Sequence, residues 1–283
     1  MNSEYQNSGR RRGSRKHKKA NFKTVFFTIL IIAALCVGLI IAGIYASGIR
    51  YKKVQITDSL YVKFLGKVDE EGAPSRGRII YSNGSEANLD VDSGEIAYSN
   101  GDTYYGELTN LLKNGQGKLV FANGDIYEGE FVNDRITGKG KLTFANGDIY
   151  EGELKDGKKI GSGKYTYADG SVYEGAFEDD KKNGHGEYLF ASGDVYIGTF
   201  KEDLKDGAGV YTWANGDVYE GDFSEDMRSG RGVYTWANGE RYEGEFKDNL
   251  MNGEGTYSWP GGRTFTGHFE NGVIVRTETE TGE

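Results

Sequence analysis

A glycine recurs every 23 residues through most of this 283-residue chain, without an insertion or deletion in the regular part. Each glycine opens a block such as GDIYEGEFVNDRITGKGKLTFAN, and the series comprises Gly101, Gly124, Gly147, Gly170, Gly193, Gly216 and Gly239. A fixed period of this length marks a repeat architecture, in which each unit buries its apolar face against its neighbours. The period therefore limits the possible folds more than any other property of the chain.

Large residues recur at alternate positions inside each block. In a representative block, Tyr127, Gly129 and Phe131 take the fourth, sixth and eighth positions. A Gly-x-Gly pair follows, and then two more large residues, Leu142 and Phe144. A spacing of two indicates a β-strand, whereas a spacing of three or four would indicate a helix. Each block is therefore predicted to form two short strands.

The Asn-Gly, Asp-Gly and Ser-Gly pairs between blocks predict hairpin turns. A two-residue loop would send the large residues of the adjoining strands to opposite faces, which a sheet with one buried face does not allow. A three-residue loop over 122–124, with its glycine in the left-handed conformation, places Leu119 beside Tyr127 and Gly117 beside Gly129. The paired glycines then let the backbone pass close beneath the rings.

The same template extends beyond the regular blocks. Phe64, Gly77 and Tyr81 stand in its register, and a shorter unit ends like the others. Atypical end units are expected, because an outermost repeat has water on one side. The predicted organisation is a basic disordered tail at 1–23, a transmembrane helix at 24–49, a linker at 50–60, two degenerate repeats at 61–100, seven repeats at 101–261, a partial repeat at 262–275 and a disordered tail at 276–283.

The pattern YEGEF, then Gly-x-Gly, an aromatic-rich strand and an Asn-Gly turn resembles the MORN repeat (membrane occupation and recognition nexus). The resemblance extends over residues 61–275. It implies an all-β fold, an elongated and twisted solenoid of antiparallel β-hairpin repeats with an aromatic-lined concave side. With strands about 4.8 Å apart, about fourteen to eighteen strands would give a domain roughly 65 to 85 Å long.

An uncharged segment of 26 residues, 24–49, precedes the repeats and is long enough to span a bilayer. Eight Lys or Arg residues stand before it and three closely follow it, which predicts a cytoplasmic N-terminus and repeats outside the cytoplasm. A cleaved signal peptide ending near 46–48 is the alternative, although its apolar run would be unusually long. A third possibility is the inverse topology, which the family resemblance implies for many relatives.

Charge divides the chain in the same place. Residues 1–53 contain eleven basic and one acidic residue, net +10, and residues 54–283 contain 23 basic and 42 acidic residues, net −19, which sum to −9. The basic tail suits an anionic cytoplasmic leaflet better than nucleic acid, because it adjoins the membrane segment. The acidic repeats should be repelled by nucleic acid and by anionic lipid. We therefore predict no nucleic-acid partner and contact with lipid through residues 24–49 alone.

Acidic residues occupy the outward strand positions of several repeats, in the pairs Glu128/Glu130, Glu151/Glu153, Glu220/Asp222 and Glu243/Glu245. A solvated face that prevents aggregation of a long sheet is the favoured interpretation. A cationic partner or loosely gathered calcium is the alternative. The chain contains no Asp-x-Asp-x-Asp-Gly loop that would make calcium binding specific, so no metal site is predicted.

The aromatic residues admit two interpretations. Tyr127 and its equivalents are interpreted as a ladder that holds the sheet together through cross-strand pairs. The last full repeats place tryptophans one period apart, next to turns, where side chains are more often exposed. The candidate binding surface, for sugar rings or a peptide, is therefore Trp213, Trp236 and Trp259 with Tyr211, Tyr234 and Tyr257.

Residues with catalytic potential do not follow the period. His17, His185 and His268 belong to no nucleophile or metal motif, and the lone cysteine, Cys36, lies within the apolar segment. The Gly-x-Gly pairs lack the strand-to-helix context of a phosphate-binding loop. We therefore predict a protein that is not an enzyme, with no catalytic residue and no cofactor.

The apolar segment also contains small residues four positions apart, which would let two such helices approach closely and self-associate: Ala34, Gly38, Ala42 and Ala46. The predicted function is a single-pass membrane scaffold that displays its repeats outside the cytoplasm to a protein or cell-envelope partner. The alternatives are a carbohydrate or peptidoglycan-binding module that uses the tryptophan row, and a scaffold that faces the cytoplasm close to lipid.

Overall fold

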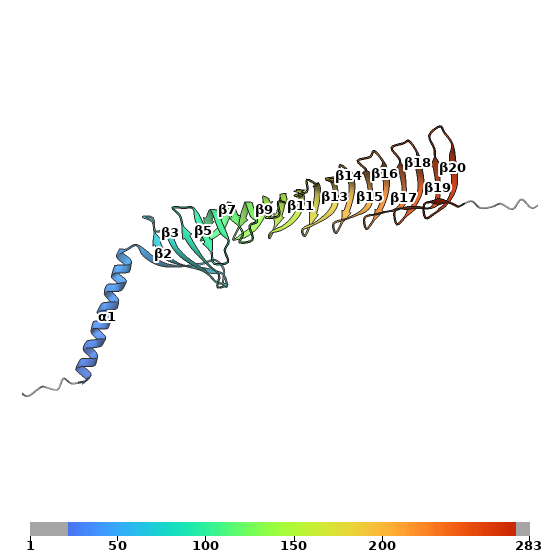
Figure 1. Ribbon diagram of the computed structural model, residues 1–283. Helices are drawn as coiled ribbons and strands as arrows, with labels where there is room; N and C mark the ends of the chain where they lie inside the picture. Colours follow the sequence, from blue (N-terminus) through green and yellow to red (C-terminus); the bar gives the residue numbers. More distant parts are fainter. Residues whose placement is uncertain (1–21, 276–283) are drawn as a thin grey trace, which may run out of the picture.

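A helix followed by one long, twisted β-sheet makes up this chain, whose computed structural model describes residues 22–275 (Figure 1). The helix extends from the N-terminal end of the sheet, and the strands follow one another along its length (Figure 1). The tails predicted at 1–23 and 276–283 lie outside the described residues, except that the helix begins at Phe22.

Helix α1, Phe22–Ala46, is apolar and exposed. Its segment Phe26–Ala46 has a mean hydropathy of 2.9, and none of it is buried against the sheet, so it is a candidate membrane span by length and composition. The prediction of a helix to residue 49 was three residues too long. The chain leaves the helix at Gly48, whose φ of 77° is the left-handed conformation that ends many helices, and Ile49 already belongs to a strand.

Five strands precede the regular repeats: β1 Ile49–Gln55, β2 Tyr61–Val68, β3 Pro74–Tyr81, β4 Glu86–Asp90 and β5 Glu95–Tyr98. The regular repeats form β6 Thr103–Thr109, β7 Leu112–Val120, β8 Ile126–Val132, β9 Arg135–Thr143, β10 Ile149–Lys155, β11 Lys158–Thr166, β12 Val172–Glu178, β13 Lys181–Leu189, β14 Val195–Lys201, β15 Leu204–Thr212, β16 Val218–Ser224, β17 Met227–Thr235, β18 Arg241–Lys247 and β19 Leu250–Ser258. The last two strands are β20 Thr264–Glu270 and β21 Val273–Ile274.

Each strand pairs antiparallel with the next one along the chain, so that the 21 strands form one open meander. The predicted fold class, an antiparallel hairpin-repeat solenoid preceded by one helix, is confirmed. The linker expected at 50–60 is wrong over its first half, because β1 pairs along its whole length with β2. That strand lacks the glycine and aromatic template, so the repeat pattern could not reveal it.

The turns between repeats have the predicted three-residue loop. The amide of Phe121 donates to the carbonyl of Asp125 at 2.9 Å, and Gly124 has a φ of 92°. Across this hairpin Leu119 pairs with Tyr127 and Gly117 with Gly129, as expected. The large residues of both strands therefore share one face.

The turns within repeats are two-residue loops whose residues both adopt left-handed conformations. Asn133 and Asp134 have φ values of 48° and 69°. Two consecutive positive φ values are the mark of a type I′ hairpin, which Asn and Asp tolerate better than most residues. Equivalent pairs recur along this rim at Asp179/Asp180, Glu202/Asp203, Glu225/Asp226 and Asp248/Asn249.

The core is a single layer of rings lying flat on glycine backbone. The Tyr127 side chain is completely buried, although the sheet has no second sheet against it. Its ring covers Gly129 and Gly140, which face each other on adjacent strands, and its hydroxyl donates to the carbonyl of Glu130 at 3.0 Å. A Cβ on Gly140 would lie only 2.6 Å from the tyrosine Oη. Glycine is therefore required at both positions.

Phenylalanines join these tyrosines from one repeat to the next. Phe131 meets the rings of Tyr127 and Tyr104 edge to face, with centroids 5.2 and 5.1 Å apart. Phe200 does the same with Tyr196 and Tyr173, at 5.1 Å each. Such T-shaped pairs stabilise beyond the area they bury. Each repeat therefore completes the core of the repeat before it.

We expect Gly140→Ala to lower the free energy of unfolding by about 2 to 4 kcal/mol, because the added methyl group would displace the Tyr127 ring. The matched control is Gly157→Asn. Gly157 lies in the turn between β10 and β11, its left-handed φ of 81° suits Asn, and nothing lies within 4 Å of its Cβ direction. Denaturant unfolding followed by circular dichroism measures both. Equal midpoints for the two variants would contradict this account of the core.

Candidate functional site

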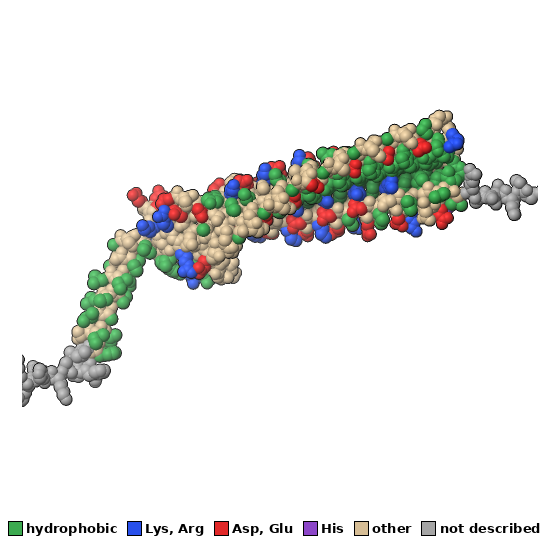
Figure 2. Space-filling view, viewed as in Figure 1, with side chains coloured by type: hydrophobic (Ala, Val, Ile, Leu, Met, Phe, Trp, Pro, Cys, Tyr) green, Lys and Arg blue, Asp and Glu red, His purple; other side chains and the backbone are tan. Residues whose placement is uncertain are grey.

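A hollow lined by hydrophobic side chains runs along the part of the sheet toward the C-terminus, between rims that carry charged residues (Figure 2). Two lines of half-buried rings lie on this face, one from the end of the second strand of each repeat and one from the first residue of the following loop. We call this surface the aromatic groove, and it comprises Tyr165, Tyr167, Tyr188, Phe190, Tyr211, Trp213, Tyr234, Trp236, Tyr257 and Trp259.

The six residues predicted as a binding surface lie together in this groove as one continuous ladder. The ring centroids of Tyr211 and Trp213 are 4.5 Å apart, and Trp213 contacts Tyr234 of the next repeat at 5.2 Å. The same alternation continues through Tyr234, Trp236, Tyr257 and Trp259 at 4.5, 5.3 and 4.7 Å. All six side chains keep part of their surface accessible to solvent. The six rings therefore pack against one another and also form part of the molecular surface.

The groove becomes aromatic only from β11 onward. In the first two regular repeats the equivalent positions are Leu119/Phe121 and Leu142/Phe144, so that one of each pair is aliphatic. The tryptophans occur only in the last three full repeats. The chemistry of this face therefore changes along the solenoid although its backbone does not.

A row of cations runs along the groove, a feature that the repeat pattern did not predict. Lys159, Lys182, Lys205 and Arg228 occupy the second position of β11, β13, β15 and β17, one period apart. Their charged ends lie over the rings of Tyr165, Tyr188, Tyr211 and Tyr234, at 5.0, 4.9, 5.5 and 5.0 Å from the centroids. Cation–π attraction favours this position.

The cations differ in their partners. Burial lowers the pKa of Lys159 and of Lys182, against the electrostatic attraction of nearby aspartates such as Asp203. Neither ammonium group has an ion pair within 4.0 Å or a hydrogen bond among the described residues. Lys205 pairs with Asp226 at 3.2 Å, and Arg228 donates to the carbonyl of Asn249 at 2.7 Å. Burial also lowers the pKa of Arg228. Two of the four charges therefore retain unused donors that face the groove.

Aspartates that directly follow the turn glycines link successive repeats along one rim of the sheet. Asp217 Oδ1 accepts a hydrogen bond from the amide of Ala237 at 2.8 Å, and its Oδ2 accepts one from the Tyr234 hydroxyl at 2.8 Å. These bonds lower the pKa of Asp217. The same carboxylate-to-amide bond joins Asp102 to Ala122, Asp125 to Ala145, Asp148 to Ala168 and Asp194 to Ala214, at 2.8 to 2.9 Å. The series ends where Pro260, which has no N–H, replaces the alanine.

The opposite rim is joined in the same way. Asp203 Oδ1 accepts a hydrogen bond of 2.8 Å from the backbone N–H of Lys182 in the preceding repeat. Equivalent bonds join Asp134 to Lys113, Asp180 to Lys159, Asp226 to Lys205 and Asn249 to Arg228, at 2.8 to 2.9 Å. The rim carboxylates therefore serve the fold, because their oxygens accept backbone hydrogen bonds.

The face opposite the aromatic groove, the convex face, does not carry the purely acidic ladder that the sequence predicted. Glu128 and Glu151 are exposed as predicted, but cross-strand lysines lie beside them, Lys118 at 3.3 Å from Glu128 and Lys141 at 3.3 Å from Glu151. The residues of strands β7 to β10 therefore alternate in charge at this level. The prediction missed the lysines because they come from the other strand of each hairpin.

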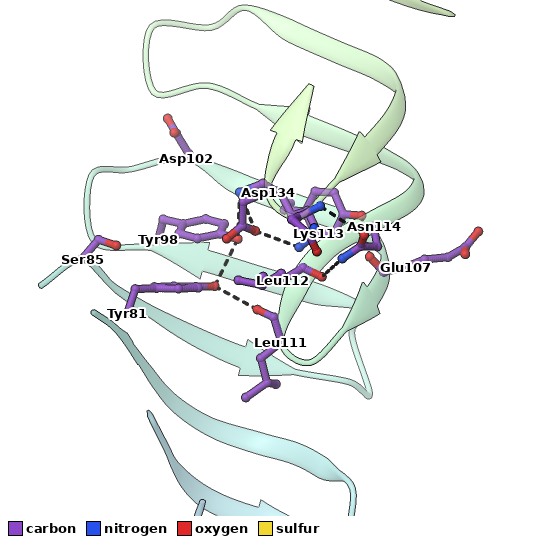
Figure 3. A network of polar contacts seen from close by, with 12 residues as sticks. Tyr81, Ser85, Tyr98, Asp102, Glu107, Leu111, Leu112, Lys113, Asn114 and Asp134 are labelled. Atoms are coloured by element: carbon purple, nitrogen blue, oxygen red, sulfur yellow. Dashed lines mark hydrogen bonds and ion pairs between the residues drawn. The ribbon is translucent and has the colours of Figure 1, made fainter. Parts of the chain in front are cut away.

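A partly buried polar network joins the degenerate repeats to the regular ones (Figure 3). Lys113 Nζ donates to the Tyr98 hydroxyl at 3.2 Å and pairs with Asp134 at 3.5 Å. The Tyr81 hydroxyl donates to the carbonyl of Leu111 at 3.3 Å, and burial raises the pKa of Tyr81 to about 12. A pocket of about 380 Å³ opens beside these groups. Since the polar atoms satisfy one another, the network acts first as a junction between the two kinds of repeat.

The remaining candidate residues do not converge. His268 Nδ1 lies 3.1 Å from Glu254 on the surface, and His185 is exposed on the convex face. Cys36 is exposed on α1, and His17 lies outside the described residues. Residues 22–275 contain no cluster of three or more His, Cys, Asp or Glu side chains that could hold a metal ion.

The repeats match a known family. The family model of the MORN repeat matches seven consecutive segments, residues 104–126, 127–149, 150–172, 173–195, 196–218, 219–241 and 242–262. These segments make up more than half of the chain. Each begins at the buried tyrosine, three residues after the turn glycine of the same repeat.

Solved structures similar to the chain include the TCP domain of Drosophila melanogaster SAS-4 with a proline-rich motif of Ana2, at 17% identity and a TM-score of 0.36, covering 62% of this chain and 88% of that one. The TCP10 domain of Danio rerio CPAP with a STIL peptide is 13% identical at a TM-score of 0.34, covering 78% and 100%. Likenesses at these scores support no statement about function. A comparison with curated proteins finds no match.

The raised pKa values of the buried tyrosines predict that the protein loses stability at alkaline pH. Burial raises the pKa of Tyr127, Tyr196 and Tyr242 to about 12, whereas an unfolded tyrosine ionises at about pH 10. The unfolded state therefore releases protons first, and the free energy of unfolding falls as the pH rises above about 10. Denaturant midpoints at neutral and alkaline pH, with tyrosinate absorbance, measure this. A midpoint that does not change up to about pH 11 would contradict it.

Proposed function

The chain belongs to the MORN-repeat family, and we propose that it is a membrane-anchored interaction scaffold without enzymatic activity, whose aromatic groove binds a protein or cell-envelope partner outside the cytoplasm. The observation that carries this proposal is the continuous ladder of half-exposed rings from Tyr165 to Trp259. Aromatic side chains supply large contact area at low entropic cost, and they are enriched where proteins bind one another.

Rigidity of the groove supports the same function. Its rings rest on the buried tyrosines, and both rims are joined between repeats by hydrogen bonds to backbone amides. A preformed surface loses little conformational freedom when a partner binds. The repeats would therefore act as a stiff platform rather than as a set of mobile modules.

Membrane attachment belongs to the proposal and follows from the apolar helix. The segment Phe26–Ala46 is long enough to cross a bilayer, and the excess of basic residues before it favours a cytoplasmic N-terminus. The stripe Ala34, Gly38, Ala42 and Ala46 would allow two helices to pack closely. In this arrangement residues 1–23 remain cytoplasmic, the segment Phe26–Ala46 contacts lipid, and the sheet from β1 to β21 is displayed.

A carbohydrate-binding module is the second candidate, favoured by one observation. Trp213, Trp236 and Trp259 form a line along one side of the groove, one repeat apart and each half-exposed. Sugars stack on rings presented in this way. The same line serves a peptide equally well, so the two candidates differ in the ligand and not in the surface.

Replacement of the tryptophan row tests the proposed function. We expect the full chain in detergent with Trp213→Ala, Trp236→Ala and Trp259→Ala to lose more than about 90% of captured protein partner, since truncated anchors each cost about 2 kcal/mol or more. The matched control replaces Tyr51 and Tyr105, which are exposed away from the groove. Loss of peptidoglycan retention in place of protein capture would favour the second candidate, and unchanged capture by the triple variant would contradict both.

Topology is tested separately by protease accessibility. If the repeats lie outside the cytoplasm, protease added to intact cells or spheroplasts should remove an epitope placed after β21 and spare one placed at the N-terminus. Permeabilised cells provide the control, in which both epitopes are accessible. Protection of the C-terminal epitope in intact cells, with cleavage after permeabilisation, would establish the inverse arrangement.

A further inference from the structure

The free hydrogen-bond donors of the aromatic groove indicate what its occupant must carry. The rim carboxylates already accept hydrogen bonds from backbone N–H groups. Asp203 accepts one from Lys182, and Asp194 accepts one from Ala214. The ammonium groups of Lys159 and Lys182 have no such partners among the described residues and are only partly buried. A carboxylate on a ligand would complete their hydrogen bonding, and charge-assisted bonds of this kind are the strong ones.

The spacing of the cations selects the shape of the ligand. Successive cations are one repeat apart, which is two strands or about 9.6 Å. A polyproline II helix has three residues per turn and rises about 9.3 Å per turn, so every third side chain points the same way at nearly this interval. In a β-strand, residues three apart point to opposite faces. The groove is therefore commensurate with polyproline II and not with an extended strand.

The rings beside the cations suit the same ligand. Each repeat presents a tyrosine and a second ring at close spacing, such as Tyr211 and Trp213 with centroids 4.5 Å apart. Flat aromatic surfaces of this kind pack against pyrrolidine rings and recognise the preformed polyproline II conformation. Its backbone has no internal hydrogen bonds, so its carbonyl groups are open to donors on a partner.

We infer that the aromatic groove binds a protein segment in the polyproline II conformation that carries a carboxylate at every third residue. This inference rests on the proposed scaffold function and specifies its partner. The row has a definite length, since Ile136 stands at the equivalent position before Lys159 and Met251 at the one after Arg228. Four cations at three intervals correspond to a ligand of about ten residues.

The experiment measures the affinity of labelled peptides for the full chain in detergent, by fluorescence anisotropy. The probe is (Pro-Pro-Glu)₄, which supplies one carboxylate for each cation. We expect it to bind at least about tenfold more tightly than (Pro-Pro-Gln)₄, which has the same shape without charge. It should exceed (Pro-Pro-Pro-Glu)₃ by a similar factor, because a spacing of four puts the carboxylates on different sides of the helix.

A pair of adjacent lysines supplies the matched variants. Lys182→Met should weaken binding of (Pro-Pro-Glu)₄ about fivefold and leave (Pro-Pro-Gln)₄ unchanged. Methionine is expected to be tolerated there, because Met251 occupies the same position in the last full repeat. Lys181→Met is the control, since Lys181 is exposed and pairs with Glu202 on the rim instead.

Each outcome separates this inference from the scaffold function. Equal affinity for the Glu and Gln peptides, or an equal loss in both lysine variants, would overturn the carboxylate register while leaving the groove as a binding surface. Absence of binding by all three peptides would overturn the inference altogether. The scaffold function is judged independently, by capture of a protein partner with the tryptophan variants.

Discussion

The close approach of a tyrosine ring to a pair of facing glycines determines the rest of this structure. The sheet has no second layer, so its rings must be buried against its own backbone, and only a surface without Cβ atoms is flat enough. Tyr127 over Gly129 and Gly140 is one instance, and Phe131 joins its ring to Tyr104 of the preceding repeat. A solenoid built in this way can be long while remaining one layer thick.

The two rims convert these stacked units into one stiff body. On each rim, a side-chain oxygen of a turn residue accepts a hydrogen bond from the backbone N–H of a neighbouring repeat. Each repeat is therefore bonded to its neighbours at both ends of its strands, in addition to the contacts between rings. At the N-terminal junction, where the period fails, the Lys113 network takes over this role. Stability in such an array depends on interfaces between neighbours, which here combine ring packing with satisfied hydrogen bonds.

Packing and the proposed binding use the same rings in this protein. The half-buried tyrosines and tryptophans of the aromatic groove extend the buried ladder and also form its solvent-facing surface, so the two interpretations of the tryptophan row do not exclude each other. The cations lie where these two roles meet. The Lys182 ammonium group, for example, lies 5.8 Å from the buried Tyr173 ring and 4.9 Å from the groove ring of Tyr188, so the groove combines an apolar floor with regularly spaced positive charge.

Sequence alone determined the repeat, the strand pairing and the face on which the rings lie, because these follow from local spacing: a period of 23, alternation by two and a glycine in each loop. It could not determine what lies across the sheet. Lys182 pairs with Phe177 beside a bulge between β12 and β13, and its ammonium group lies 5.8 Å from the rings of Tyr173 in β12 and Phe200 in β14. Strand β1 and the lysines beside Glu128 were hidden for the same reason, since their partners come from other strands. Tertiary structure decided these contacts, because they depend on register and twist between strands rather than on the order of residues within one.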